Sequence, residues 1–438
     1  MRTYRIAHTI IAFLSAAMIL LWCTSSPAQE SAIHKAIENC AESISDSLLS
    51  LRRDLHRHPE LSGREARTSK VVTEYLNSLG LSVMSNVGGY GVVGILEGGK
   101  PGPTYLWRAD MDANADSSAD NVEFKSVFPG VKHSCGHDVH TTIALGIAKV
   151  LSSMREKLSG TVLFLFQPAE ENLTGAKAVI DAGLFERRKP DANFALHIGP
   201  LPAGLLTAKP LEMFAFRMRV RIELKDVTDQ DETLKICAGF LKELNTPSGV
   251  NILAVPLDDR EKGAFNPGSA LTNYVAVAGT PRIRKEGDRI TVVESLAFSS
   301  SDSIMGAAIA RMRATVGSSP LKHQLVNISC APWHPTVTND PELTEMSMGI
   351  LQKIYGNERI VPLYGVIPRF NDDFAFLQKE TRGVYFFLGG SSAEQGIIAM
   401  PHAPNFTVDE RCIGMGVKYF SSLLYELQLK PVKRMPIH

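Results

Sequence analysis

A cluster of residue types that bind metals stands in the first half of the chain. Three histidines and one cysteine fall within residues 133–140, in the sequence HSCGHDVH. Imidazole and thiolate are ligands that zinc and other borderline-soft divalent metals favour. The spacing matches no zinc finger, so a polar loop whose histidines cap the following helix is the alternative. We interpret the cluster as a metal site.

Paired carboxylates follow two apolar segments that we expect to be strands. Glu170 and Glu171 come after residues 162–166, and Asp110 and Asp112 come after residues 104–107. In the pair Glu170 and Glu171, one carboxylate can bind a metal while the other takes a proton from water, whose pKa a divalent ion lowers to about 7. Asp110 and Asp112 are partners that a metal or a ligand histidine would need. The alternatives are a solvated acidic loop and aspartates that cap the backbone.

Two single histidines complete the set of candidate ligands. His197 ends the apolar segment 194–198, and His402 lies in the sequence MPHAP at 400–404. A lone histidine is usually structural, so neither residue predicts a metal ligand by itself. They become candidate ligands only in combination with the cysteine, histidines and carboxylates described above.

The segments that must position these side chains alternate between strand and helix patterns. Short apolar runs at 92–96, 104–107, 162–166 and 194–198 predict strands, and residues 141–158 have helical spacing. This order is typical of an α/β sheet, which places ligands at the carboxyl ends of its strands. Residues 31–81 predict two helices. After residue 321 we expect a helix, a strand and a closing helix at 341–356, 385–388 and 410–427.

The pattern changes after residue 211. Residues 214–224 alternate apolar and charged side chains, as in an antiparallel strand with one solvated face. Helices at 232–244 and 301–316 and strands at 274–278 and 289–296 follow. We predict a three-layer α/β domain, a mixed sheet flanked by helices, from residues 31–211 and 321–428. A smaller α+β domain, residues 212–320, is inserted into it.

Composition excludes several function classes. The chain has 438 residues, 44% of them hydrophobic, and 46 basic residues balance 46 acidic ones. A net charge of zero creates no overall field to attract nucleic acid or an anionic membrane. We therefore expect a globular protein that acts on a small molecule and binds no nucleic acid.

The first 28 residues have the pattern of a signal peptide. Arg2 and Arg5 precede an apolar run at 10–22, and a small-residue site ends at Ala28. The run is shorter than the roughly 18–20 residues of a membrane span, and Trp22 before Cys23 disfavours a lipoprotein. We expect an exported protein, periplasmic or secreted, without a stable membrane span. In an oxidising compartment, pairing is open to the following cysteines: Cys40, Cys237, Cys330 and Cys412.

Taken together, the motifs resemble those of one enzyme family. They are LHRHPELS at 55–62, RADMD at 108–112, HSCGHDVH at 133–140, FQPAEE at 166–171, ALH at 195–197, PTVTNDPEL at 335–343 and PHAP at 401–404. In order and context they resemble the amidohydrolase branch of the dinuclear aminoacylase and carboxypeptidase metallopeptidases. Hippurate hydrolases and auxin-conjugate hydrolases belong to that branch. The resemblance covers residues 31–211 and 321–427.

The resemblance implies a role for each motif residue. Two divalent metal ions, Zn, Mn, Co or Ni, would be held by five ligands: Cys135, His137, Glu171, His197 and His402. Cys135 would bridge the ions, Asp112 would orient a ligand imidazole, and Glu170 would be the general base. The reaction implied is attack of activated water on the amide bond of an N-acyl amino acid, an amino-acid conjugate or a short peptide. The resemblance also implies that residues 31–211 and 321–428 form the catalytic domain and that the inserted domain, residues 212–320, is a lid through which a homodimer forms. Within this lid, residues 246–269 are expected to be an expanded loop.

The lid departs from the family pattern. Members of this branch carry a lid histidine that stabilises the oxyanion, whereas no histidine lies between His197 and His323 in this chain. Asn266 or a lid arginine is a possible replacement. The family also has Glu where Asp372 stands. A lost oxyanion donor costs about 10²–10³ in rate, so two alternatives stay open: a catalytically impaired, metal-bearing binding protein and a structural protein with a vestigial site.

Overall fold

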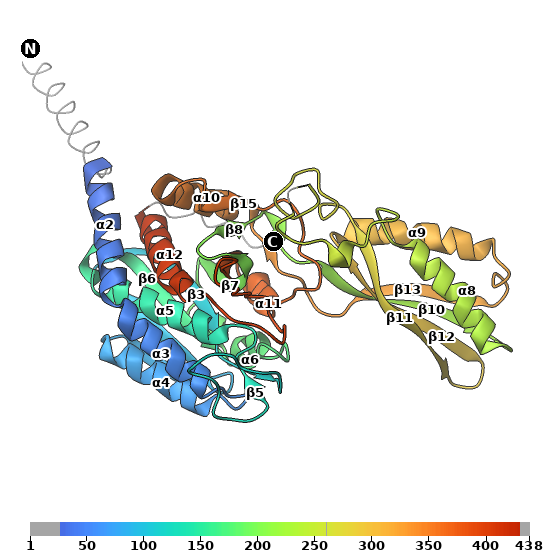
Figure 1. Ribbon diagram of the computed structural model, residues 1–438, viewed down its shortest axis with the longest axis horizontal. Helices are drawn as coiled ribbons and strands as arrows, with labels where there is room; N and C mark the ends of the chain where they lie inside the picture. The colour runs from blue at the N-terminus through green and yellow to red at the C-terminus, as the bar shows by residue number, and fades with distance from the viewer. Residues whose placement is uncertain (1–26, 260, 430–438) are drawn as a thin grey trace, which may run out of the picture.

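The computed structural model describes residues 27–259 and 261–429. The predicted signal peptide, residues 1–28, therefore lies almost wholly outside the described residues. The described chain forms a larger α/β body and an elongated smaller body that projects from it (Figure 1). It passes from the larger body into the smaller one and then returns, as the sequence predicts.

An eight-stranded mixed sheet forms the centre of the larger body, in the order β1-β2-β6-β3-β7-β16-β8-β15. Its strands are β1 (Ser82–Val87), β2 (Gly91–Glu97), β3 (Lys100–Asp110), β6 (Ser159–Gln167), β7 (Ala192–Pro202), β8 (Leu206–Ala208), β15 (Ile360–Pro362) and β16 (Gly383–Ser391). The central strands β6, β3, β7 and β16 are parallel to one another. The pairs β1–β2, β2–β6 and β16–β8 are antiparallel, and β15 runs parallel to β8 at the sheet edge. The carboxyl ends of the parallel strands therefore meet at one edge, where polar side chains gather.

Helices cover both faces of this sheet, because alternate strand residues are apolar on both sides. One face packs against α2 (Pro27–Ser43), α3 (Ser45–Arg57), α4 (Ala66–Ser78), α5 (His137–Ser152), α10 (Pro341–Tyr355) and α12 (Arg411–Leu429). The other packs against α6 (Gly175–Asp181), α7 (Leu184–Arg187) and α11 (Phe374–Glu380). Trp107 points into the first core and its neighbour Leu106 into the second. The predicted three-layer domain is confirmed, although residues 27–81 form three helices instead of two.

The smaller body is a four-stranded antiparallel sheet, in the order β11-β12-β10-β13, with two helices on one face (Figure 1). Its elements are β10 (Phe216–Lys225), α8 (Gln230–Glu243), β11 (Val275–Glu286), β12 (Ile290–Ser299), α9 (Asp302–Gly317) and β13 (Leu325–Pro332). The apolar residues of β10 pack against α8 and α9, so its arginines lie on the open face. The boundary predicted at residue 320 is too early, because β13 pairs with β10 in this sheet.

The remaining elements are short and lie in the connecting segments of the chain. They are the strand pairs β4 (Asn114–Ala115) with β5 (Val131–Lys132) and β9 (Leu211–Glu212) with β14 (Thr338–Asn339), and the single turns η1 (Arg155–Lys157) and η2 (Ile252–Ala254). The turn η2 lies in the predicted expanded loop, whose Ile252 and Ala264 are buried in the second core of the larger body. This loop therefore attaches the lid to the catalytic domain.

The pairing that the sequence left open for four cysteines does not occur in the described part of the chain. Cys40, Cys237, Cys330 and Cys412 are all free thiols in the described part of the chain. Cys237 is buried in the lid core and Cys412 in the first core of the catalytic domain, so packing separates them. Within the described residues, no helix combines the length and apolar character needed to cross a bilayer.

Candidate metal centre

The carboxyl edge of the large sheet carries the predicted ligands. Asp110 and Gln167 are the last residues of β3 and β6 and lie opposite each other. Cys135 and His137 flank Gly136, the N-cap residue just before α5, which has a left-handed backbone (φ 89°). A Cβ at Gly136 would lie 2.5 Å from Ile198 Cγ2, so glycine permits the close approach of α5 to β7. The sequence therefore holds both ligands against the strand that carries His197.

All five predicted ligands converge. Cys135 Sγ lies 3.3 Å from His197 Nε2, and Glu171 Oε1 lies 3.1 Å from His402 Nε2. Cys135, His137 and His197 form one group whose ligand atoms lie within 4.8 Å of one another, and Cys135, Glu171 and His402 form a second. Cys135 belongs to both groups, which is the arrangement that a bridging thiolate requires.

The chemistry of these side chains fits a divalent cation. His137 is buried, yet its Nε2 has no hydrogen-bond partner and lies 3.7 Å from Glu171 Oε1. Burial and the carboxylates of Glu171 and Glu170 raise the pKa of the Cys135 thiol well above its usual range. A thiolate at this position therefore needs a compensating positive charge, which a bound cation supplies.

Asp112 lies behind the candidate ligands, where an orienting carboxylate is expected. Its Oδ1 is 3.3 Å from His137 Nδ1. Its Oδ2 accepts hydrogen bonds from the Ser62 hydroxyl at 2.6 Å and from the Glu171 amide at 3.0 Å. This buried carboxylate therefore lies beside the imidazole of one candidate ligand and holds the backbone of another, which is where orienting groups commonly lie in metal sites.

The other two histidines of the cluster have different neighbours. His140 lies 2.6 Å from Asp110 through Nδ1 and accepts the Ile198 amide hydrogen at 2.9 Å through Nε2. His133 is buried, and burial lowers its pKa to about 4, so its imidazole is neutral. Of the three imidazoles in residues 133–140, only His137 joins the five-ligand set.

The pKa values of the adjacent carboxyl groups of Glu170 and Glu171 are shifted in opposite directions. Burial and the negative charges of Asp372 and Asp373 raise the pKa of Glu170 well above its usual range. Burial also opposes ionisation of Glu171, but the hydrogen bond from His402 and the charge of His137 lower its pKa to about 2. One carboxylate is therefore suited to proton transfer and the other to holding a cation.

A buried arginine supports the site from behind. Arg108 forms ion pairs with Asp110 at 2.5 Å and with Asp372 and Asp373 at 3.0 Å each. Asp372 also accepts a hydrogen bond from the Tyr385 hydroxyl at 2.5 Å. Burial and the charge of Asp372 raise the pKa of Asp373 to about 7, although Arg108 opposes the shift. Asp372 therefore belongs to the charge network beside Glu170.

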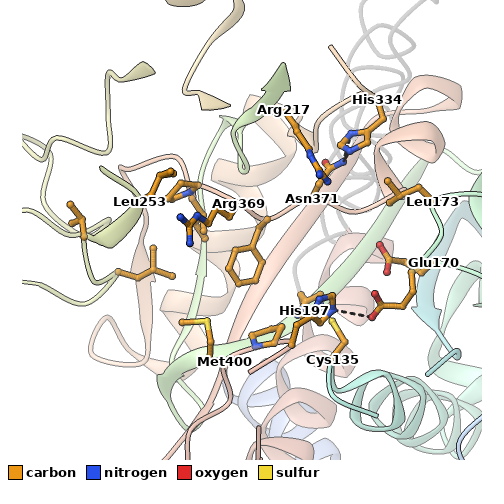
Figure 2. Close-up of a pocket in the computed structure, with 18 residues that line it drawn as sticks. Cys135, Glu170, Leu173, His197, Arg217, Leu253, His334, Arg369, Asn371 and Met400 are labelled. Atoms are coloured by element: carbon orange, nitrogen blue, oxygen red, sulfur yellow. Dashed lines mark hydrogen bonds and ion pairs between the residues drawn. The ribbon is translucent and has the colours of Figure 1, made fainter. Parts of the chain in front are cut away.

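The candidate ligands open into a cavity of about 520 Å³ between the catalytic domain and the lid (Figure 2). Its polar wall includes Arg217 from β10, Arg369, His334 and Asn371, whose amide nitrogen contacts the His334 ring. Its apolar wall is formed by the following side chains: Leu253, Val255, Leu257, Ile367, Phe370 and Met400. Figure 2 shows Arg217, His334 and Asn371 together on the side of the cavity away from Cys135 and His197.

Sequence reasoning missed most of this wall. A lid arginine was one predicted replacement for the lid histidine, and Arg217 does line the cavity, whereas Asn266 does not. The alternating arginines of residues 214–224 were the available signal for Arg217. Nothing in the sequence pattern marked His334 and Arg369 as site residues. They follow β13 and β15, and only the folding of the chain brings these segments to the cavity.

A three-layer α/β domain with an inserted lid, convergent Cys, His and Glu side chains and a buried carboxylate define a metallohydrolase. Residues 106–426 match Peptidase family M20/M25/M40. The chain is 30% identical over 396 residues to thermostable carboxypeptidase 2 of Saccharolobus solfataricus, covering 87% of this chain and 95% of that protein. It is 30% identical over 413 residues to IAA-amino acid hydrolase ILR1-like 4 of Arabidopsis thaliana, covering 88% and 87%.

A solved structure has the same fold. The YXEP protein of Bacillus subtilis, described as a dinuclear metal binding peptidase, superposes with a TM-score of 0.70 at 24% identity. The match covers 89% of this chain and 99% of that one. This chain belongs to Peptidase family M20/M25/M40 and is a hydrolytic enzyme.

Proposed function

We propose that this protein is an exported, dinuclear metal amidohydrolase that cleaves the amide bond of N-acyl amino acids, amino-acid conjugates or short peptides. One observation carries the proposal: five ligand side chains converge around Cys135 beside the buried Glu170 at the base of a cavity. When bound, two divalent ions would polarise the amide carbonyl and lower the pKa of water. The Cys, His and Glu ligands suit Zn, Mn, Co and Ni alike.

Glu170 performs the proton transfers of this proposal. It lines the cavity, and burial and the neighbouring carboxylates raise its pKa well above its usual range, which makes its carboxylate a stronger proton acceptor. It takes a proton from the attacking water as the oxygen–carbon bond forms. It then delivers that proton to the leaving nitrogen as the carbon–nitrogen bond breaks, so the products are a carboxylate and an amine.

The cavity walls support the substrate class. Arg217 and Arg369 have no carboxylate partner among the described residues, so their guanidinium groups are available to the α-carboxylate of an amino acid. The apolar wall opposite suits an acyl group. The names of the similar carboxypeptidase and IAA-amino acid hydrolase also describe proteins that act on carboxylate-bearing amides.

The test is hydrolysis by the leaderless protein, loaded with Mn or Zn, of a panel of N-acetyl amino acids, N-benzoyl amino acids and dipeptides. Glu170→Gln is the matched variant, because it keeps the size of the side chain and all five ligands. We expect hydrolysis by the parent and a loss of about 10²–10⁴-fold in kcat for the variant, with equal metal content in both. Bound metal without hydrolysis of any substrate would reject this substrate class and favour the metal-bearing binding protein.

Two further parts of the proposal concern the cell and the assembly. Export is supported by the signal-peptide pattern of residues 1–28, so N-terminal sequencing of protein from a periplasmic fraction should begin at Gln29.

A homodimer through the lid is supported by the two edge strands of the lid sheet, β11 and β13, which could each pair with a strand of a second chain. Sedimentation should then give twice the mass of one chain, and a monomer would reject the dimer.

A further inference from the structure

A second cavity, of about 330 Å³, lies on the open face of the lid sheet. Arg219 of β10, Arg282 of β11, Leu296 of β12 and Trp333, which follows β13, are among its lining residues. This face is opposite the one that packs against α8 and α9. The cavity is therefore separate from the lid core and from the five candidate ligands.

An irregularity of the sheet creates this cavity. The register of β11 against β12 shifts between Ala278 and Arg282, so the intervening residues leave the regular ladder. Gly279 takes a left-handed backbone there (φ 73°), and it lines the cavity with Thr280. Bulges of this kind often re-aim side chains beside binding sites, and here the bulge places Arg282 at the cavity wall.

Trp333 connects this cavity to the candidate metal centre. The Arg217 guanidinium lies 4.7 Å from the Trp333 ring centre and the Arg219 guanidinium lies 4.6 Å from it. Arg217 lines the cavity of the metal centre, and Arg219 lines the second cavity. Trp333 is 53% exposed, so the stack of two guanidiniums and one indole forms an accessible track between the two cavities.

The charges on this face are unevenly neutralised. Arg221 pairs with Glu286 at 2.8 Å, and Arg284 pairs with the same carboxylate at 2.5 Å. Arg284 also lies 3.7 Å from Glu294, the one acidic residue that lines the cavity. No ion pair joins Arg217, Arg219 or Arg282 to a carboxylate within the described residues. Three unpaired positive charges therefore follow the track from the metal centre outward.

We propose that this track is an extended substrate subsite that binds a second carboxylate, carried by the part of the substrate farther from the reacting amide. The proposal rests on the proposed function and adds a preference for acidic, extended substrates such as glutamate-rich peptides. Arg219 and Arg282 would bind the distal carboxylate, and Trp333 would contact the chain between it and the amide. The track carries only three unpaired arginines and the chain as a whole has no net charge, which favours a small acidic ligand over a polyanion.

The test measures binding of tri-glutamate and of tri-alanine to metal-loaded Glu170→Gln protein by calorimetry, because this variant prevents turnover. We expect tri-glutamate to bind about tenfold more tightly, which corresponds to ~1.4 kcal/mol. The double variant Arg219→Gln/Arg282→Gln should remove this difference, and Trp333→Ala should reduce it. Binding of tri-alanine should change less than twofold in both.

The matched control is Arg221→Gln/Arg284→Gln on the same sheet face. It removes the same two positive charges, but from arginines that already have carboxylate partners. The tri-glutamate preference should persist in this control. Equal binding of the two peptides, or an equal loss in both double variants, would overturn the subsite. Neither result would affect hydrolysis of monocarboxylate substrates by the parent, so failure of the subsite and failure of the proposed function are distinguishable.

Discussion

At the scale of single residues, neighbours in the sequence have unlike surroundings. His133, His137 and His140 lie within eight residues, yet His137 faces Cys135 and Glu171 while His140 pairs with Asp110. Residue types and spacing predicted which motifs form the site, and the resemblance to a known family assigned roles within each motif. Spacing alone does not separate the three imidazoles, because their contacts come from other elements of the fold.

This difference predicts unlike effects for two substitutions in one motif. His137→Ala should lower the metal content of purified protein, because it removes a side chain from one group of candidate ligands. His133→Ala should leave the metal content unchanged, because His133 belongs to neither of these groups. Elemental analysis after dialysis against a defined metal concentration measures both. Equal metal loss in the two variants would contradict the assignment.

Asp373 should make stability depend on pH. Its pKa is raised to about 7, so the folded protein keeps a proton that the unfolded chain releases near pH 4. Folding then binds protons, and this group's contribution to stability falls as pH rises from about 4 to 7.

Asp373→Asn should remove that contribution. The melting temperature of metal-free protein should therefore fall less over this pH range in the variant than in the parent, even if the variant is less stable throughout. Asp181→Asn is the control, because Asp181 is exposed and pairs only with Lys177 on the same helix face. A parallel pH profile for parent and Asp373→Asn would refute the shift.

At the scale of elements, strong patterns were predictable and weak ones were not. The arginine-alternating strand and both lid helices were predicted within a few residues, because each has one apolar face. Strand β13 was missed, because Ile328 is its only buried residue among those from 325 to 332. The helices α2 and α3 were merged because no proline or glycine separates them. Edge strands and helix breaks of this kind are fixed by tertiary contacts instead of local pattern.

The start of α5 predicts a second pair of variants. Gly136→Ala should weaken metal binding and lower the melting temperature, because alanine disfavours φ 89° and its Cβ would displace Ile198 beside His197. Gly130→Ala is the control: its φ is 77°, but a Cβ there meets nothing within 4 Å. Both substitutions should lower the free energy of unfolding by roughly 1–2 kcal/mol, because alanine disfavours a left-handed backbone. Only Gly136→Ala should also change metal affinity, measured by competition with a chromogenic chelator.

At the scale of the whole molecule, the division into two bodies was predictable, but the cavity between them was not. The change of pattern near residue 211 predicted where the lid begins. The cavity wall, however, combines Arg217, Leu253 and Asn371, which lie far apart in the sequence. The chain enters and leaves the lid at neighbouring points, because the Trp333 amide donates to the Arg217 carbonyl at 2.9 Å. All five candidate ligands lie outside the lid.

This arrangement predicts the effect of excising the lid. A chain in which Gly-Ser-Gly replaces residues 216–333 should still bind metal, because it keeps every candidate ligand and the whole eight-stranded sheet. It should melt at a lower temperature, because Ile252 and Tyr274 no longer cover the second core of the catalytic domain. Hydrolysis should fall at least about 100-fold, because the chain loses Arg217 and the loop that carries part of the apolar wall. Undiminished hydrolysis would show that the lid neither positions nor selects the substrate, whereas loss of metal would show that the ligands depend on the lid for their geometry.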